Sequence, residues 1–348
     1  MSSLIWKLFL VNKEELRGYL YIPPLFGILE AVLTKRRIIE VLATGGFDST
    51  CRLCELSFDK DVEVIPTYLI TPDRGNGDLE QNALKKIVKI LQTSKRTKAY
   101  IHNPLFIYEK QIPPAYLLNS FNILKETKDR FLAVQYLNAA VYAIHHPGIE
   151  LCYERYYINR DEPLRKMIFA NNAVLFDSYG VGYLDKSKAD PDVYNLFGNF
   201  RFPMIMRTNA DELELYRKFK YENMLQYVSF CRRHYPRPCG FCSTCREKIL
   251  KGFFYFFNDT AIRYYLVYRM VNRYIRQECI PKGIIKESNL KEHLFMIESI
   301  LEALHDNKFF ASDKHFSGYE FLVEKVIYYY NMSFDEILGI SDLNYKGK

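Results

Sequence analysis

Short apolar runs alternate with amphipathic segments at the start of the recognisable fold. Residues 38–43 form a β-branched run that ends before a glycine pair, and residues 49–58 follow with leucines at helical spacing. Residues 62–70 form a second apolar run, and residues 79–91 place an apolar side chain at every fourth position. These patterns predict two successive units, each a strand followed by a helix.

The alternation continues to residue 221 with weaker periodicity. We expect further strands at 98–101, 148–152 and 201–207, and further helices at 131–144 and 210–221. Strands that alternate with helices build a parallel sheet with helices on both faces. The expected fold class is therefore α/β, with a doubly wound parallel sheet.

The C-terminal part of the chain has a different pattern. Residues 260–277, 290–305 and 320–330 have helical periodicity without intervening strands. The expected organisation is an N-terminal addition at 1–37, a main domain at 38–253 and a helical C-terminal region at 254–348.

Composition and charge set broad limits on the protein class. The 348 residues are 49% hydrophobic, enough for a sizeable core, and the formal charge of +7 fits nucleic acid, phosphorylated ligands or a merely solvated basic surface. The apolar stretch 20–33 contains Pro23, Pro24 and Glu30 and is shorter than the roughly 20 residues that span a bilayer. We expect a cytoplasmic protein without membrane contact, in which the eight cysteines are reduced or bind metal.

The glycine pair belongs to the hexapeptide Thr44-Gly45-Gly46-Phe47-Asp48-Ser49. Glycines after a strand let backbone amides approach an anion, and the following helix N-terminus supplies N–H donors. Ser49 and Thr50 add hydroxyls, while Asp48 could cap the helix or hold magnesium. The lysine of a Walker loop is missing. A glycine-rich turn capped by Asp48 is the alternative interpretation.

Four cysteines lie within fifteen residues near the end of the expected main domain, at Cys231, Cys239, Cys242 and Cys245. Four thiolates at this spacing suit a tetrahedral zinc ion within the segment 231–245. An iron–sulfur cluster and four buried or redox-active cysteines remain alternatives. The basic residues Arg232, Arg233, His234, Arg237 and Arg246 would favour thiolates, and could also face phosphate or an acidic substrate.

The hexapeptide resembles the SGGxDS signature of the PP-loop ATP pyrophosphatases, with Thr44 in place of serine. The resemblance implies an adenine nucleotide alpha hydrolase-like fold with ATP and magnesium as cofactors. It also implies that a substrate oxygen attacks the α phosphorus to form an adenylate. The nucleotide-binding residues it implies are Ala43, Thr44, Gly45, Gly46, Phe47, Asp48, Ser49 and Thr50. Asp48 and Ser49 are the catalytic candidates among them.

The order of the loop and the sequence Cys239-Gly240-Phe241-Cys242-Ser243-Thr244-Cys245 narrows this resemblance to the 7-cyano-7-deazaguanine synthase (QueC) family, over about residues 38–253. Members of that family adenylate the carboxylate of a 7-deazapurine and use ammonia to form an amide and then a nitrile. The sequence departs from the family pattern in segments 71–76 and 152–161, where a substrate base would be read, and extends further after Phe253. A different acceptor, including one in an antiviral defence system, stays open.

Two other functions are compatible with the sequence. A PP-loop tRNA thiolase would use Cys51 or Cys54, although their helical spacing favours core positions. A non-catalytic zinc module would use the loop only for protein interaction.

The expected partners of the adenylating enzyme are the 7-deazapurine carboxylate, ammonia, a protein bound through the helical C-terminal region and a second copy in a homodimer. Nucleic acid is allowed as a partner but not required.

Overall fold

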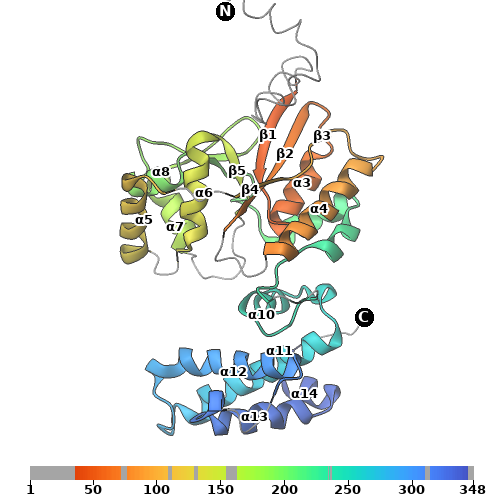
Figure 1. Ribbon diagram of the computed structural model, residues 1–348, viewed down its shortest axis with the longest axis vertical. Helices are drawn as coiled ribbons and strands as arrows, with labels where there is room; N and C mark the ends of the chain where they lie inside the picture. Colours follow the sequence, from red (N-terminus) through yellow and green to blue (C-terminus); the bar gives the residue numbers. More distant parts are fainter. Residues whose placement is uncertain are drawn as a thin grey trace, which may run out of the picture. The chain divides into compact units, whose positions relative to one another are not determined.

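The computed structural model describes residues 36–71, 77–108, 112–128, 132–153, 163–233, 235, 237–309 and 314–343. The chain divides into two compact units (Figure 1). Unit 1 comprises the residues up to Ala43, together with Asp48–Leu69 and Val88–Lys220. Unit 2 comprises Thr44–Phe47, Ile70–Ile87 and the residues from Tyr221 onward.

A mostly parallel sheet forms the centre of unit 1. Its strands are β1 (Arg37–Leu42), β2 (Val62–Ile70), β3 (Tyr100–Ile101), β4 (Leu105–Tyr108), β5 (Ile149–Leu151) and β8 (Phe200–Arg201). The strand order is β3-β2-β1-β5-β8, and β4 pairs with β2. All four pairs along that path are parallel, with Arg37 opposite Val62 and Leu42 opposite Thr67 between β1 and β2. The expected α/β class with a mostly parallel central sheet is confirmed.

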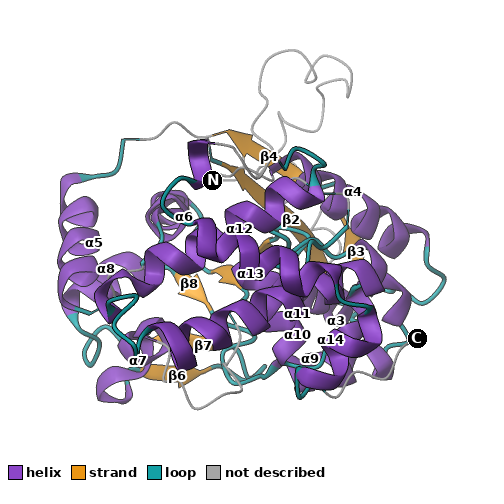
Figure 2. Ribbon diagram, turned by 90° about the horizontal axis from the view of Figure 1, so that it is seen from below, coloured by secondary structure: helices purple, strands orange, loops and turns teal. Residues whose placement is uncertain are grey.

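Helices connect the strands of this sheet. They are α3 (Phe47–Leu56), α4 (Gly77–Thr93), α5 (Ala115–Thr127), α6 (Val134–His145), α7 (Pro163–Phe169), α8 (Pro191–Phe197) and α9 (Asn209–Lys218). Helix α8 packs against α5, α6 and α7, and the buried core there includes Leu117, Phe121, Leu137 and Phe197. The short ribbon of β6 (Val174–Phe176) and β7 (Gly182–Leu184) is antiparallel (Figure 2).

Two predicted strands are shorter than expected. The strand predicted at 201–207 is wrong beyond Arg201, because Pro203 has no N–H for a ladder and Phe202 instead forms an antiparallel bridge with Gly182. The strand predicted at 98–101 begins only at Tyr100, since the N–H groups of Lys98 and Ala99 donate to the Ser57 carbonyl.

Unit 2 is mainly helical. Its helices from Tyr221 onward are α10 (Ser243–Leu250), α11 (Asp259–Tyr274), α12 (Leu290–His305), α13 (Glu320–Asn331) and α14 (Phe334–Ile340). Helix α11 contacts each of the other four, and α11 to α14 lie side by side (Figure 2). The predicted helices 290–305 and 320–330 are confirmed, and 260–277 forms α11 followed by a π-helical turn at Ile275–Cys279.

The four cysteines belong to the same hydrophobic core as these helices. Cys231, Cys239, Cys242 and Cys245 are buried with residues that extend to Ile337 of α14. The expected boundary at 253/254 therefore falls inside one core, and the N-terminal addition 1–37 lies almost wholly outside the described residues. No helix in the described part of the chain combines the length and apolarity required to cross a bilayer.

Candidate functional site

The predicted phosphate loop follows β1, and at this strand the order in which successive strands are added to the sheet changes direction. Strand β1 has β2 on one side and β5 on the other, so the chain passes to opposite sides of β1. Ligands of open α/β sheets bind beyond the carboxyl end of the strands at such a switch point. Ala43 continues β1 by donating its N–H to the Thr67 carbonyl at 2.8 Å, and the loop begins at the next residue.

Gly45 has a backbone that no other residue type could adopt without strain. Its φ is +67°, and an added Cβ would lie 2.9 Å from the backbone nitrogen of Leu84 and 3.1 Å from the Glu80 carbonyl oxygen in α4. The next amide, that of Gly46, donates to the Thr44 hydroxyl at 3.2 Å. Gly45 is thus required for close passage of the loop beside α4.

Two buried hydroxyls lie in the first turn of α3. Ser49 is 6% exposed and Thr50 is fully buried, and neither side-chain oxygen has a hydrogen-bond partner among the residues that the structure describes. Buried polar atoms are usually satisfied, so such atoms mark a place where a ligand or water belongs. The first N–H groups of an α-helix also lack intrahelical acceptors. This turn can therefore donate hydrogen bonds to an anion, and half-buried Asp48 lies in the same turn.

The four cysteine sulfurs form one cluster that could bind a metal ion. All four atoms lie within 4.8 Å of one another, and the sulfurs of Cys239 and Cys245 are 3.9 Å apart. Ligand sulfurs around one tetrahedral zinc ion are about 3.8 Å apart, because each Zn–S bond is about 2.3 Å. All eight cysteines are within the described residues, and none forms a disulfide. The donor set and its spacing fit a single zinc ion.

Local backbone geometry brings these sulfurs together. Gly240 has φ +85°, and a Cβ there would lie 1.8 Å from the Ala261 carbonyl oxygen of α11. Cys242 is the N-cap of α10, and its N–H donates to the sulfur of Cys239 at 3.3 Å. Hydrogen bonds from Cys231, Cys239 and Cys245 lower the pKa of Cys242.

Two of the basic residues beside the cysteines pair with helix α12. Arg233 contacts Glu302 at 2.8 Å and Glu298 at 3.5 Å, and Arg246 also pairs with Glu298. The guanidinium of Arg246 lies 3.8 Å from the ring centroid of Tyr268 in α11. These arginines therefore fasten the cysteine segment to the helices, instead of facing phosphate or an acidic substrate as the sequence had allowed.

Within unit 2, the first half of the phosphate loop contacts the residues around the cysteine segment. The Ser229 N–H donates to the Gly45 carbonyl at 2.8 Å, two residues before Cys231. The Phe47 ring packs edge-on against Phe253 and Phe256, with centroids 5.4 Å and 6.1 Å apart. Phe253 and Phe256, from the aromatic run 253–257, thus pack against the loop. The two motifs predicted separately from sequence are neighbours in this unit.

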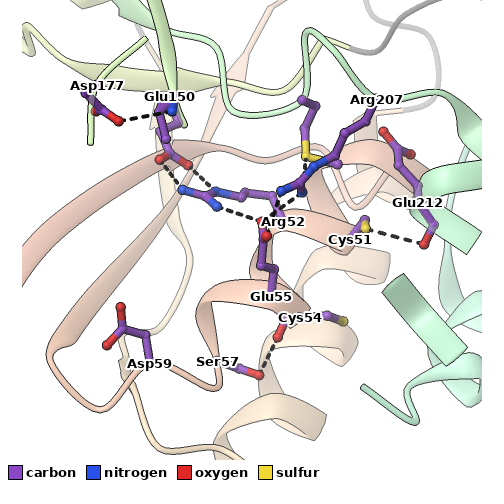
Figure 3. Close-up of polar contacts among 12 residues, drawn as sticks. Cys51, Arg52, Cys54, Glu55, Ser57, Asp59, Glu150, Asp177, Arg207 and Glu212 are labelled. Atoms are coloured by element: carbon purple, nitrogen blue, oxygen red, sulfur yellow. Dashed lines mark hydrogen bonds and ion pairs between the residues drawn. The ribbon is translucent and has the colours of Figure 1, made fainter. Parts of the chain in front are cut away.

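Unit 1 contains a buried ion-pair network that sequence patterns did not reveal (Figure 3). Arg52 of α3 binds both oxygens of Glu150 in β5, at 2.8 Å and 2.7 Å, and binds Glu55 at 2.6 Å. Arg207 completes the network through two contacts with Glu55, at 2.9 Å and 2.7 Å. Helical spacing could have flagged Arg52 and Glu55, but nothing in the sequence indicates the partners far along the chain.

Cys51, Cys54 and His146 lie in surroundings that suit a role in stabilising the fold. Cys51 and Cys54 are each 1% exposed, as their helical spacing predicted, and burial raises the pKa of both thiols. His146 contacts Glu40 at 2.8 Å and stacks on Tyr142. The substrate base was expected to be read by segments 71–76 and 152–161, and most of both, residues 72–76 and 154–161, lies outside the described residues, as does His234.

Comparison with known proteins gave no match. No protein-family model matches the chain, and neither the curated proteins nor the solved structures contain a significant relative.

Proposed function

We propose that this protein is an ATP-dependent adenylating enzyme of the PP-loop type, similar to 7-cyano-7-deazaguanine synthase. In this proposal, ATP and magnesium bind at the loop 43–50, and a carboxylate oxygen of a 7-deazapurine attacks the α phosphorus. Pyrophosphate leaves, and ammonia then displaces AMP from the acyl adenylate to give an amide. A second ATP would drive dehydration of the amide to a nitrile.

The observation that carries the proposal is the pair of buried hydroxyls at Ser49 and Thr50, in the turn that follows β1 at the switch point of the sheet. Hydroxyls and helix N–H groups at such a place suit a phosphate chain. Gly45 supports the same proposal, because its backbone passes close to α4. A tight phosphate-binding loop needs such a close approach, whereas a simple surface turn does not. Asp48 would hold magnesium, for which carboxylates are preferred ligands.

The metal in this proposal is zinc in a structural role. Four protein thiolates complete a tetrahedral site and leave no position for substrate, which is typical of structural zinc. In an iron–sulfur cluster with four irons, each thiolate binds a different iron, so the sulfurs would stand further apart than the 4.8 Å found here. Metal analysis of protein purified without added metal would show about one zinc per chain and no acid-labile sulfide.

A sulfur-transfer function has no structural support. A thiolase cysteine must reach its substrate as a thiolate, whereas burial raises the pKa of Cys51 and Cys54 well above the usual value. A Cys51→Ser and Cys54→Ser double variant should keep full activity in the adenylation assay.

The decisive test measures pyrophosphate release with ATP, magnesium and 7-carboxy-7-deazaguanine, with and without ammonium. We expect release that depends on the carboxylate, a nitrile product by mass spectrometry, and loss of both in Asp48→Ala. Binding of ATP without release would retain the nucleotide site and reject this acceptor, and tRNA and protein termini would be tested next. Absence of ATP binding would reject the proposal and favour a non-catalytic zinc module.

A further inference from the structure

Exposed cationic side chains gather at one edge of unit 1. Three segments of this unit supply them: 57–61 between α3 and β2, 94–99 between α4 and β3, and 217–220 at the end of α9. Because β2 and β3 are parallel, the first two segments lie at the amino-terminal edge of the sheet. The exposed lysines and arginines of these segments are called the basic patch, which consists of Lys60, Lys95, Arg96, Lys98, Arg217, Lys218 and Lys220.

Contacts between the three segments make the basic patch one continuous surface. Each segment contacts both of the others. The Ser57 carbonyl accepts the Lys98 N–H at 2.7 Å, the Phe58 ring stacks on Phe219 with centroids 4.6 Å apart, and the Arg96 guanidinium donates to the Lys220 carbonyl. The seven cations are therefore held together by the fold of unit 1, although they lie up to 160 positions apart in the sequence.

The fold leaves the charge of the basic patch without neutralising partners. None of its seven side chains forms an ion pair within the described part of the chain, whereas Lys128, elsewhere in unit 1, pairs with Asp190. The same three segments contain two acidic residues, Asp59 and Asp61, and Asp59 contacts Arg37 at 3.5 Å. Seven cations against two acids leave an excess of five positive charges, in a chain whose net charge is +7.

Helix stabilisation explains only two of these cations. A basic residue in the last turn of a helix stabilises that helix, and Arg217 and Lys218 lie in the last turn of α9. The last turns of α3 and α4 contain no basic residue. The other five cations lie in the connections, where no helix requires them.

The composition of the basic patch suits the phosphates of a nucleic acid better than the surface of a protein. Protein interfaces have an apolar centre and are depleted in lysine. Among the described residues of the three segments and their immediate neighbours in sequence, Tyr100 is the only large apolar residue that is exposed, at 46%. Lysine and arginine supply most of the affinity for a phosphate backbone, and an adjacent aromatic ring adds a surface on which a base can stack.

We propose that the basic patch binds the phosphate backbone of a nucleic acid. Ser57, which follows α3 in Figure 3, marks the end of that helix next to the patch. Ser49 and Thr50 lie at its other end, about 15 Å away along a helix of 10 residues. A nucleic acid on the patch would therefore dock to the protein without occupying the proposed ATP site. The inference goes beyond the proposed function and does not depend on it.

The test measures fluorescence anisotropy of labelled RNA of about 20 nucleotides and of a DNA duplex of about 20 base pairs, between about 50 and 200 mM salt. The full-length, zinc-loaded protein is used. The patch variant removes one exposed cation from each segment, by Lys60→Gln, Lys95→Gln and Lys218→Gln. The control variant changes the net charge equally at exposed lysines elsewhere in unit 1, by Lys125→Gln, Lys186→Gln and Lys188→Gln.

We expect the wild type to bind at least one of the two nucleic acids and to lose affinity steeply as salt increases. The patch variant should bind about tenfold more weakly at the lower salt concentration. Its plot of log affinity against log salt should be shallower by about 2, because each lost phosphate contact removes about 0.7 to 0.9 from the slope. The control variant should stay within about twofold of the wild type.

Three results would overturn the proposal. Equal losses in the patch and control variants would show that binding follows net charge and has no defined surface. Absence of binding by the wild type at the lower salt concentration would show that the patch only keeps the protein in solution. Binding to vesicles that contain phosphatidylserine, without binding to either nucleic acid, would assign the patch to a membrane surface.

Discussion

At the scale of single residues, the loop hydroxyls make the most specific prediction. Thr50→Val removes a hydroxyl that is buried without a partner among the described residues. We expect the free energy of unfolding to stay within about 0.5 kcal/mol of the wild type or to rise, because no protein hydrogen bond is lost. The affinity for MgATP should fall about tenfold. Urea unfolding and calorimetry measure the two effects separately.

Thr67→Val is the matched control for this prediction. Thr67 is also fully buried, but its hydroxyl donates to Glu40 at 2.7 Å. Its removal should cost about 1–3 kcal/mol of stability, since a partly buried carboxylate loses a donor. If Thr50→Val instead destabilises the protein and leaves the affinity for ATP intact, Thr50 stabilises the fold and does not bind the nucleotide.

The sequence indicates some residues of the candidate sites and misses others for a physical reason. Gly45 and the four cysteines are recognisable because the motifs to which they belong span only a few positions. The partners of Arg52 are not recognisable in this way, since Glu150 is 98 positions from Arg52. Contacts of this kind depend on the tertiary fold.

At the scale of elements, the network of Arg52, Glu55, Glu150 and Arg207 joins α3 to β5 and to the segment before α9. Burial by itself would raise the pKa of Glu55, but hydrogen bonds from Arg207 and the charge of Arg52 outweigh burial and lower it. A carboxylate whose pKa is lowered in the folded state stabilises the fold above its unfolded pKa. That stabilisation is lost as the pH falls through the folded pKa.

We therefore predict that Glu55→Gln lowers the free energy of unfolding by about 3 kcal/mol at pH 7, because two guanidinium groups lose the charge of a partly buried partner. Below a pH of about 4, the difference from the wild type should shrink, since Glu55 is then protonated in the unfolded state and becomes protonated in the folded state as the pH falls through its lowered folded pKa. Urea unfolding of both proteins from pH 7 to pH 3 measures this difference in the free energy of unfolding. The exposed Glu214→Gln serves as control. A difference independent of pH would show that packing, not charge, explains the cost.

Strands and helices with their own periodicity are predictable, while those defined by partners are not. Residues 38–43 and 62–70 are mainly apolar because both faces of a parallel sheet are covered, and both form strands as expected. Residues 201–207 also look like a strand, but Pro203 ends the pairing after two residues. The β6–β7 ribbon was missed because its three-residue strands are too short to show alternation.

The docking of the cysteine segment on α11 makes a prediction about a single glycine. Gly240→Ala would place a Cβ against the Ala261 carbonyl at a positive φ, whereas Gly252→Ala has a similar φ of +82° and no atom within 4 Å of the added Cβ. Gly252→Ala should cost about 1 kcal/mol, from backbone strain alone. Gly240→Ala should cost several times more and lower zinc occupancy. Equal losses in the two variants would contradict the close approach to α11.

At the scale of the whole molecule, the two units have different sources of stability. Unit 1 has a parallel sheet and a buried ion-pair network, neither of which involves the four cysteines. Unit 2 includes the cysteines within its helical core, beside residues of α11, α12, α13 and α14. Because a structural zinc site contributes its binding free energy to folding, the metal should affect the two units unequally.

Removal of zinc should therefore unfold the helices of unit 2 and leave the sheet of unit 1 protected. Hydrogen exchange with mass spectrometry, with and without a strong chelator, would show loss of protection from α10 through α14 and retained protection in β1, β2 and β5. Cys242→Ser should reproduce the pattern without chelator, and restored zinc should reverse it only in the wild type. If protection is lost only at residues 231–245, the metal stabilises a local turn. If it is lost everywhere, the core of unit 1 depends on the metal as well, and the separation of the two sources of stability is wrong.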